Sequence, residues 1–313
     1  MIKPKFSVAI ALAPYRNAEV LKSLGEIDYP KDGFEIIIKK GFNPSENRNN
    51  CAAEAKGEIL AFIDDDAIVD KNILRNAEEF FDKHPEIDIV GGPQITPEND
   101  KFFARASGFA LESYFGSFTM RNRYTKGRLN LNADELSITS ANCFMRKSSF
   151  DKTAGYNTNL FPGEDPEFFA RVKISGQKIA YNPELIIYHR RRPSIKSFGK
   201  QVFKYGEVCL PKEKYNNRKA SPIFFFPIAF VFYIYALPFT FILTKLALIP
   251  LLIYILFAVS ASIDAAIEHR SLPAVFALPF IFLFMHMSYG LGMLKSIVKR
   301  SNTYKIPQKQ ENI

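Results

Sequence analysis

The chain has 313 residues, a formal net charge of +9 and 47% hydrophobic residues, enough for one large domain or two modest ones. The positive charge does not make nucleic acid the expected partner, because it is concentrated beside an apolar segment and no recognised nucleic-acid-binding module accompanies it. Three cysteines, an odd number without metal-ligand spacing, fit a reducing compartment.

The first sixty residues alternate short apolar runs with helical patterns. Residues 5–13, 34–38 and 59–63 predict strands, whereas residues 18–24 and 47–55 predict helices. Strands that alternate with helices indicate a doubly wound, mostly parallel sheet, in which ligands bind beyond the carboxyl ends of the strands. The first apolar run is too short for a secretory signal and leads into polar sequence, so we expect no cleaved leader.

Three adjacent carboxylates, Asp64, Asp65 and Asp66, follow the third predicted strand. They repel one another and are costly to desolvate, so at the end of a buried strand they usually need a cation between them. Oxygen ligands with few protein carboxylates suit Mg²⁺ or Mn²⁺, which also bind a substrate diphosphate. A solvated acidic loop is the alternative. The turn at residues 14–16 ends the first strand, so two strand ends are predicted to face one crevice.

The pattern continues with a helix over 71–83, a strand over 87–92, a helix over 102–118, a loop over 119–132 and a strand over 137–146. These elements extend the alternation and add no repeat. They predict that the same α/β domain continues past the middle of the chain.

Glu164 and Asp165 stand at the predicted start of a further helix, where the macrodipole and free amides keep carboxylates ionised. An ionised carboxylate that faces a crevice can take a proton from an attacking hydroxyl. An acidic first turn is the structural alternative. His189 precedes three arginines, which indicates either a metal or diphosphate site or a membrane-facing basic cluster.

Three segments without any charged residue follow, at residues 222–243, 246–263 and 272–294. Each is about the length that crosses a hydrocarbon layer roughly 30 Å thick, although the second is short. One such segment could be a buried soluble helix, but three in succession predict that the last third is embedded in a membrane.

Positive charge is concentrated on both sides of these segments. Residues 190–219 carry a net charge of +8, and the residues after Leu294 carry +4. A basic belt before a membrane span attracts anionic headgroups and marks the cytoplasmic side, so we expect a protein of the cytoplasmic membrane whose catalytic domain faces the cytoplasm. Residues 194–208 separate apolar from lysine side chains, as a helix in the headgroup plane does.

Three full crossings would place the basic tail outside, against the positive-inside tendency. Because only Thr244 and Lys245 separate the first two apolar segments, a tight hairpin that does not fully cross is the preferred hypothesis. His286, an ionisable residue within the third apolar segment, has either a functional role or a role in helix packing. The predicted parts are a catalytic domain (1–193), a basic interfacial helix and linker (194–220), a multi-pass transmembrane region of two to three segments (221–298) and a basic tail (299–313).

Taken in order, these residues resemble the family 2 glycosyltransferases, which have the GT-A fold and transfer a sugar from a nucleotide-diphosphate donor. Each motif is weak alone, but the order and spacing over residues 5–206 are specific. The motifs are Pro14-Tyr15-Arg16-Asn17, Arg48-Asn49, Gly57-Glu58 before Asp64-Asp65-Asp66, the strand containing Asn142, Gly163-Glu164-Asp165 and Gln201-Val202-Phe203-Lys204-Tyr205. Residues 286–292 further resemble membrane glycosyltransferases of the succinoglycan type.

The resemblance implies an α/β fold, with a Rossmann-like, mostly parallel GT-A sheet, helices on both faces, an interfacial amphipathic helix and C-terminal transmembrane helices. It implies that Asp64, Asp66 and His189 bind Mg²⁺ or Mn²⁺. Asp165 would be the general base, and Glu164 would position it.

The resemblance also assigns residues to the two substrates. Tyr15 and Arg48 would flank the nucleotide base, and Asp64 would contact the donor ribose or the metal. The donor-binding residues are Pro14, Tyr15, Arg16, Asn17, Arg48, Asp64 and Asp65. The residues over the diphosphate and acceptor are Asn142, His189, Gln201 and Lys204.

The chain departs from the family pattern in two places. Residues 38–45 lack the acid that reads a uracil edge, which leaves the nucleotide open and makes Lys39 or Lys40 a candidate phosphate contact. Lys204-Tyr205 stands in place of an Arg-Trp pair, which disfavours a processive polymer synthase.

The leading hypothesis is an inverting, metal-dependent glycosyltransferase of the hexosyltransferase class. It would move a sugar from a nucleotide-sugar donor to a polyprenyl-linked or polysaccharide-precursor acceptor in the membrane, beside anionic headgroups. The alternatives are a polyprenyl-phosphate monosaccharide synthase and, from a different class, a catalytically inactive membrane scaffold that keeps the fold.

Overall fold

The computed structural model describes residues 3–215 and 221–299, so the predicted tail beyond Lys299 and the end of the predicted linker lie outside the described residues. By its contacts, the chain divides into two compact units. The described part of the first unit comprises residues 3–97 and 122–190, and that of the second comprises residues 98–121, 191–215 and 221–299.

The first unit is built on a six-stranded sheet with the strand order β2-β1-β3-β7-β5-β8. β1 runs parallel to β2 and β3, and β5 runs parallel to β8, whereas β7 is antiparallel to both of its neighbours. The predicted mostly parallel α/β sheet is therefore confirmed, with β7 as the reversed strand. The strands are β1 (Phe6–Leu12), β2 (Phe34–Lys40), β3 (Ile59–Ile63), β5 (Ile89–Gly91), β7 (Asn142–Arg146) and β8 (Ile179–Tyr181).

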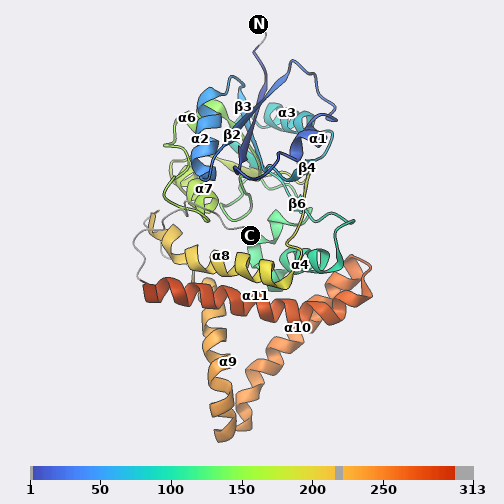
Figure 1. The fold of residues 1–313 in the computed structure, drawn as a ribbon, viewed down its shortest axis with the longest axis vertical. Coiled ribbons are helices and arrows are strands. Elements are labelled where there is room, and N and C mark those ends of the chain that lie inside the picture. The colour runs from blue at the N-terminus through green and yellow to red at the C-terminus, as the bar shows by residue number, and fades with distance from the viewer. Residues whose placement is uncertain (1–2, 216–220, 300–313) are drawn as a thin grey trace. The chain divides into compact units, whose positions relative to one another are not determined.

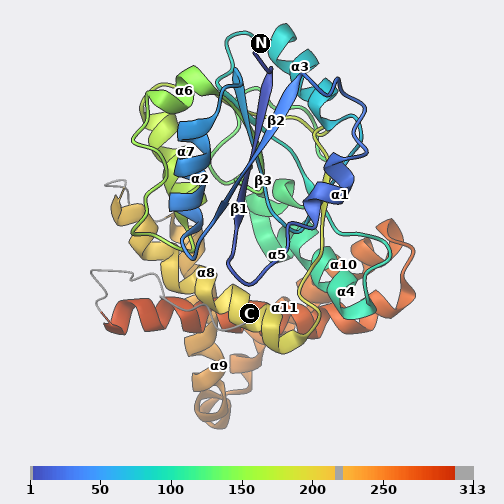
Figure 2. The same ribbon diagram turned by 45° about the horizontal axis from the view of Figure 1, so that its top comes forward.

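Helices cover both faces of this sheet, as predicted (Figure 2). In β3, Ile59, Ala61 and Ile63 join one core cluster while Leu60 and Phe62 join the other, because successive side chains of a strand point to opposite faces. Strands buried on both faces read as continuous apolar runs, which is what the sequence shows. The first cluster packs against α1 (Val20–Leu24) and α3 (Ile73–Lys83), and the second against α2 (Pro44–Glu54), α6 (Lys147–Asp151) and α7 (Glu164–Ile174).

A second, three-stranded sheet has the order β4-β9-β6. It consists of β4 (Ala67–Val69), β9 (Ile187–His189) and β6 (Gln94–Ile95). β9 pairs antiparallel with β4, and the register places His189 opposite Ala67. The pairing therefore brings His189 to the residues that directly follow β3.

The second unit is helical. It contains α4 (Phe102–Glu112), α5 (Tyr114–Ser117), α8 (Ile195–Tyr215), α9 (Phe226–Leu243), α10 (Ile249–Glu268) and α11 (Leu272–Lys299), with the short 3₁₀ turns η2 (Pro222–Phe225) and η3 (Lys245–Leu248). Within this unit α11 runs beside α8, and α9 and α10 form a hairpin that leaves α11 (Figure 1). The segments 222–243, 245–268 and 272–298 are long and apolar enough to cross a membrane, as the sequence predicted.

Two details differ from the expected layout. The 3₁₀ helix η1 (Phe118–Arg123) occupies the start of the predicted loop over 119–132. Residues 98–121, which were expected within the catalytic domain, belong to the helical unit by their contacts. The predicted domain limits at 193, 220 and 298 otherwise stay predictions.

Candidate active site

Three potential metal ligands gather beyond the carboxyl end of β3. Asp64, Asp66 and His189 each offer one ligand atom, and these atoms lie within 4.8 Å of one another. The imidazole Nε2 lies 3.2 Å from an oxygen of Asp66 and 3.8 Å from an oxygen of Asp64. The three residues that were predicted to bind a metal are thus brought together by the pairing of β4 with β9.

The second ring nitrogen of His189 lies 3.1 Å from the carbonyl oxygen of Arg190. Because a carbonyl only accepts, Nδ1 carries the hydrogen of this bond. In the protonated ring Nε2 donates to the carboxylates, and in the neutral ring it holds a lone pair that a metal could accept. A carbonyl partner on the far nitrogen is the usual arrangement of a metal-binding histidine. Two of the three donors are carboxylates, the ligand type that suits Mg²⁺ and Mn²⁺, so the residues fit the predicted metal.

The electrostatics keep both carboxylates of this group charged. Burial acts to raise the pKa of Asp64, but the hydrogen bond with His189 and the charge of Arg48 outweigh it and lower that pKa. The pKa of Asp66 is lowered in the same way, against burial, by His189 and by Arg16. Ionised oxygens facing one another are what a divalent cation requires.

Asp65 does not belong to the potential ligand group. Its Oδ1 lies 3.0 Å from Arg16 in an ion pair, and the same guanidinium also pairs with Asp66. The other oxygen of Asp65 is buried without a hydrogen-bond partner among the described residues. Burial raises the pKa of Asp65 to about 7, although Arg16 opposes the shift. Arg16, predicted to bind the donor, thus has two carboxylate partners.

Arg48 links this group to the start of α7. Asn43 caps α2 by accepting from two backbone amides of its first turn, which fixes the helix that carries Arg48. The guanidinium lies 3.0 Å from Glu164, 3.3 Å from Asp64 and 3.8 Å from Asp165, and its side chain is only 8% exposed. With three carboxylate neighbours, its predicted place beside a nucleotide base rests on the resemblance alone.

The two carboxylate oxygens of Asp165 have different surroundings, and Oδ1 is the one that lies buried 3.8 Å from Arg48. Its Oδ2 accepts from the backbone amide of Ser140 at 3.0 Å, whereas Oδ1 has no hydrogen-bond partner among the described residues. Glu164 beside it is buried, and this burial together with the charge of Asp165 raises the pKa of Glu164 to about 7. The pair therefore combines a carboxylate that has one oxygen without a hydrogen bond with a buried neighbour that holds a proton more readily than usual.

Other predicted donor and acceptor residues lie outside this cluster. Pro14, Tyr15 and Asn17 follow β1, and Tyr15 is about half exposed. Asn142 is fully buried, and its amide donates to the carbonyl oxygens of Pro93 and Leu185. Its role at an acceptor remains a prediction from the resemblance.

Gln201 and Lys204 belong to α8 in the second unit, where Gln201 donates to the hydroxyl of Tyr205 at 2.9 Å. Their predicted contacts with the diphosphate and acceptor therefore stay predictions. Lys39, suggested as a phosphate contact, forms an ion pair with Glu54.

Ser140 and Tyr156 complete the site, and sequence reasoning missed both. The hydroxyl of Tyr156 lies 2.7 Å from that of Ser140, and its buried ring stacks on Phe168. Arg48 lies over the same ring at 5.5 Å. Ser140 lies at the start of the predicted 137–146 strand, which is a weak signal. Tyr156 lies in an irregular segment and carries none.

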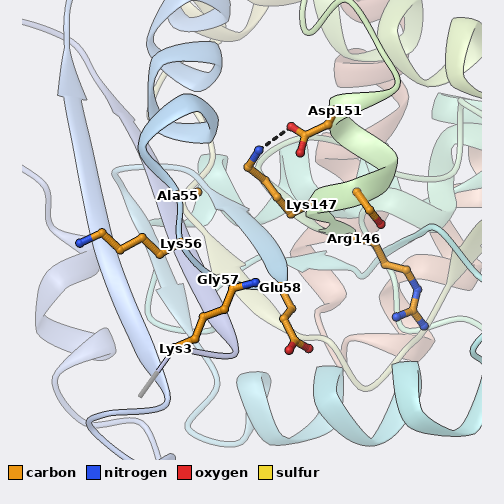
Figure 3. A pocket seen from close by; sticks show the side chains of 9 residues that line it. Lys3, Ala55, Lys56, Gly57, Glu58, Arg146, Lys147 and Asp151 are labelled. Atoms are coloured by element: carbon orange, nitrogen blue, oxygen red, sulfur yellow. Dashed lines mark hydrogen bonds and ion pairs between the residues drawn. The ribbon is translucent and has the colours of Figure 1, made fainter. Parts of the chain in front are cut away.

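A pocket of about 610 Å³ opens at the opposite end of the sheet (Figure 3). Gly57 and Glu58 precede β3 and Arg146 ends β7, so this pocket lies where β3 begins and the acidic cluster lies where β3 ends. Its Lys147 and Asp151 are paired with each other. The pocket therefore cannot contain the acidic cluster.

The profile of the glycosyl transferase family group 2 matches residues 59–295, well over half of the chain. The chain belongs to this family. It is therefore a glycosyltransferase, as predicted. A curated protein of Methanococcus voltae, dolichyl N-acetyl-alpha-D-glucosaminyl phosphate 3-beta-D-2,3-diacetamido-2,3-dideoxy-beta-D-glucuronosyltransferase, is 28% identical over 152 residues. The match covers 48% of this chain and 44% of that protein, so it spans less than half the length of this relative.

Two solved structures share the fold. The mannosyltransferase PcManGT from Pyrobaculum calidifontis, in complex with GDP-Man and Mn²⁺, superposes with a TM-score of 0.56 at 16% identity over 96% of this chain and 89% of that one. Residues 1–349 of S. aureus TarS, in complex with UDP-GlcNAc, superpose with a TM-score of 0.50 at 16% identity over 95% and 92%. At this identity the likeness concerns the fold, and it agrees with the predicted GT-A class.

Proposed function

We propose that this glycosyltransferase is inverting and metal-dependent, and that it transfers a sugar from a nucleotide-diphosphate donor to a lipid-linked acceptor at the membrane. One observation carries the proposal: a single guanidinium, that of Arg48, lies 3.3 Å from Asp64 of the potential metal group and 3.8 Å from Asp165. The donor side and the candidate base are therefore neighbours rather than being separated by packed core.

Asp64, Asp66 and His189 are the residues that would hold Mg²⁺ or Mn²⁺. Such an ion, when bound, neutralises the charge that develops on a departing diphosphate. The Mn²⁺ named with the mannosyltransferase of the same fold supports this choice of metal. The identity of the ion is part of the proposal.

Asp165 is the proposed general base. Its Oδ1, which is buried 3.8 Å from Arg48 and has no hydrogen-bond partner among the described residues, would accept the proton of an acceptor hydroxyl, while the amide of Ser140 holds Oδ2 in place. The acceptor oxygen then forms a bond to the anomeric carbon as the bond from that carbon to the diphosphate oxygen breaks. Attack opposite the leaving diphosphate inverts the configuration, and the electron pair leaves with the diphosphate.

A lipid-linked acceptor is supported by two observations. The relative from Methanococcus voltae is named for a dolichyl phosphate-linked sugar, and the second unit carries three helices long and apolar enough to cross a membrane. The basic residues around these segments favour the cytoplasmic membrane, anionic headgroups and a catalytic unit that faces the cytoplasm.

The donor is tested by incubating the purified full chain with a panel of UDP- and GDP-sugars and either Mn²⁺ or Mg²⁺. We expect release of the nucleotide from one class of donor, and only with metal present. Equal release with and without a chelator would contradict the metal dependence. Because residues 38–45 lack the acid that would read a uracil edge, the proposal is compatible with either a uracil or a guanine nucleotide in the donor.

The acceptor is tested with bare polyprenyl phosphate against a polyprenyl diphosphate-linked sugar. Transfer to the linked sugar supports the proposal, whereas transfer to bare phosphate indicates a polyprenyl-phosphate monosaccharide synthase. Asp165→Asn should abolish transfer, and Asp151→Asn, which alters the pocket at the other end of the sheet, should not. Transfer by Asp165→Asn at the wild-type rate would refute the role of the base. An unchanged cellular product in both Asp165→Asn and Asp66→Asn would favour an inactive scaffold.

A further inference from the structure

The three long apolar helices do not have the same surroundings. The most apolar stretch of α11 is 39% buried within the structure, compared with 17% for each of the other two segments. A helix that crosses a bilayer in isolation leaves most of its surface to lipid, whereas α11 packs against protein along much of its length. The three helices have similar apolar composition, but α11 is packed against protein more extensively than the other two.

α11 lies against α8 at backbone contact. A Cβ atom at Gly206 of α8 would come within 2.1 Å of the carbonyl oxygen of Tyr289, and one at Gly292 of α11 within 2.0 Å of the carbonyl oxygen of Phe203. Further along, Lys295 forms an ion pair with Glu207 at 2.7 Å. Gly199 of α8 lies against Phe284 and Glu207 lies against Lys295, so the two helices advance in the same direction and run side by side (Figure 1).

α8 cannot lie in a hydrocarbon core. Lys196 and Lys200 are exposed, and Lys204 is partly exposed. Partial burial near the charges of Lys200 and Arg192 lowers the pKa of Lys204, as expected where cations crowd together. Charged side chains of this density belong at the headgroup level, where an amphipathic helix lies in the membrane plane. A helix in close contact along α8 must lie at the same depth.

The exposed surface of α11 fits this placement. Leu272, Phe276, Phe280 and Leu283 are exposed and recur every three or four residues, so they form one apolar stripe. The opposite side is buried against the rest of the unit, including Leu278 and Phe282. α11 therefore has one apolar face left for lipid and one face covered by protein, which is the surface expected of a helix in the membrane plane.

The hairpin of α9 and α10 has a different character. Its tip is almost entirely exposed and apolar, with Ile242 81% and Leu243 85% exposed, and Lys245 is the only charged residue between positions 221 and 263. Tyr233 joins the two arms by donating to the carbonyl oxygen of Ala247 and accepting from the amide of Leu251. The 18 residues of α9 extend over about 27 Å, close to the thickness of the hydrocarbon layer.

The base of the hairpin is fixed to α11. A Cβ at Gly290 would come within 2.3 Å of the carbonyl oxygen of Pro227, at the start of α9. Tyr254 of α10 bonds to His286 of α11 at 2.9 Å, and the other ring nitrogen of His286 bonds to the carbonyl oxygen of Phe115. α9 therefore leaves the plane of α8 and α11 close to the point at which α10 returns to it.

We propose that only the α9–α10 hairpin enters the hydrocarbon of the bilayer, and that α8 and α11 lie together in the headgroup plane on one side. The third apolar segment is then not a crossing, and the chain enters and leaves the membrane on the same face. The partner is a lipid bilayer with anionic headgroups, which the lysines of α8 complement. The inference concerns membrane placement and does not depend on the proposed sugar transfer.

The chain contains no tryptophan, so each single substitution introduces one fluorescent reporter. We would reconstitute the full-length variants Phe276→Trp, Leu283→Trp and Ile297→Trp into vesicles whose lipids carry quenchers at different depths, with Tyr235→Trp in α9 as the deep reference. All four side chains are at least one-third exposed, so the replacements do not disturb a core. Phe280→Trp, on the same stripe, is a second reporter for the middle of α11.

The three α11 reporters should share one shallow depth, and Tyr235→Trp should lie near the bilayer centre. A spanning α11 would instead separate Phe276 and Ile297 by about 30 Å along the membrane normal, at 1.5 Å per residue, with Leu283 and Phe280 deeper than either. That pattern would overturn the proposal, as would a shallow Tyr235→Trp, because the hairpin would then not be inserted. Sugar transfer needs no measurement, so failure here is distinct from failure of the proposed function.

Discussion

Arg48 holds together three carboxylates from two distant segments of the chain. Its replacement in Arg48→Met would leave Asp64, Glu164 and Asp165 without their shared cation. Removing one partner of a buried ionic group typically costs about 3–5 kcal/mol, because the remaining charges stay buried. We expect the free energy of unfolding of the purified chain to fall by that order, measured by denaturant titration.

The matched control for this change is Arg75→Met. Arg75 pairs with Asp28 at 3.2 Å, but both side chains are more than half exposed. Exposed pairs contribute roughly 0–1 kcal/mol, so this variant should unfold close to the wild-type midpoint. Equal losses in the two variants would mean that the cluster around Arg48 is not a cooperative buried unit.

A substitution of Asp66 tests the proposed metal site without an assay of sugar transfer. Asp66→Asn removes a charged ligand while preserving the shape of the side chain, so Mn²⁺ affinity should fall at least about tenfold, since even residues that only support a ligand commonly contribute that much. Electron paramagnetic resonance of free Mn²⁺ during titration of the full chain measures this directly. Asp82→Asn, an exposed acid on α3, should bind as the wild type does. Unchanged affinity in Asp66→Asn would rule out Asp66 as a ligand.

The raised pKa of Glu164 predicts how the free energy of unfolding depends on pH. Its pKa is raised to about 7 in the folded chain, above the model-peptide value of 4.5, so between these values the folded state binds a proton that the unfolded state does not. The stability that this proton contributes is present below about pH 4.5 and is lost as the pH rises through 7. Glu164→Gln cannot titrate, so its unfolding midpoint should change less with pH over that window. Parallel curves for the two proteins would contradict the assignment.

Long helices and strands with a periodic apolar pattern could be predicted from the sequence, whereas very short strands could not. β1, β3 and the start of α7 carry continuous apolar runs or an acidic first turn, and these signals placed Asp64 and Asp165 correctly at element ends. β4 and β9 have three residues each, too few for any periodicity, yet their pairing is what moves His189 to Asp66. The partners of Arg48 were equally hidden, because three segments distant in sequence meet there only after folding.

The contact of α8 with α11 gives a prediction at the same scale. Gly206→Ala would place a Cβ within 2.1 Å of the Tyr289 carbonyl, so the two backbones must separate. Overpacking of this kind typically costs about 1–3 kcal/mol, and we expect a lower melting temperature of the detergent-purified chain. At Gly127 a Cβ meets nothing closer than 3.5 Å, so Gly127→Ala serves as the control. A melting temperature of Gly206→Ala equal to that of the control would mean that the helices are not in backbone contact.

For the whole molecule, the length and composition of an apolar segment predict that it can cross a bilayer but not that it does. α11 approaches the backbone of α8 closely at Gly206 and Gly292, and no hydropathy pattern records such a contact. The conflict seen in the sequence, a basic tail on the wrong side after three crossings, disappears when the hairpin alone is inserted. Both basic regions then lie on one face, as the positive-inside tendency requires.

This arrangement predicts the side of the membrane on which the chain ends. Residues 190–219 carry a net charge of +8 and those after Leu294 carry +4, whereas the hairpin tip carries only Lys245. A fluorescent protein fused to the C-terminus of the full chain should therefore fluoresce in bacterial cells, and alkaline phosphatase fused there should be inactive, because both report a cytoplasmic location. Phosphatase fused after Lys5 within an otherwise intact chain should be inactive as well, since it marks the side of the catalytic unit. An active phosphatase at the C-terminus alone would mean an odd number of crossings, and α11 would then have to span the bilayer despite its contact with α8.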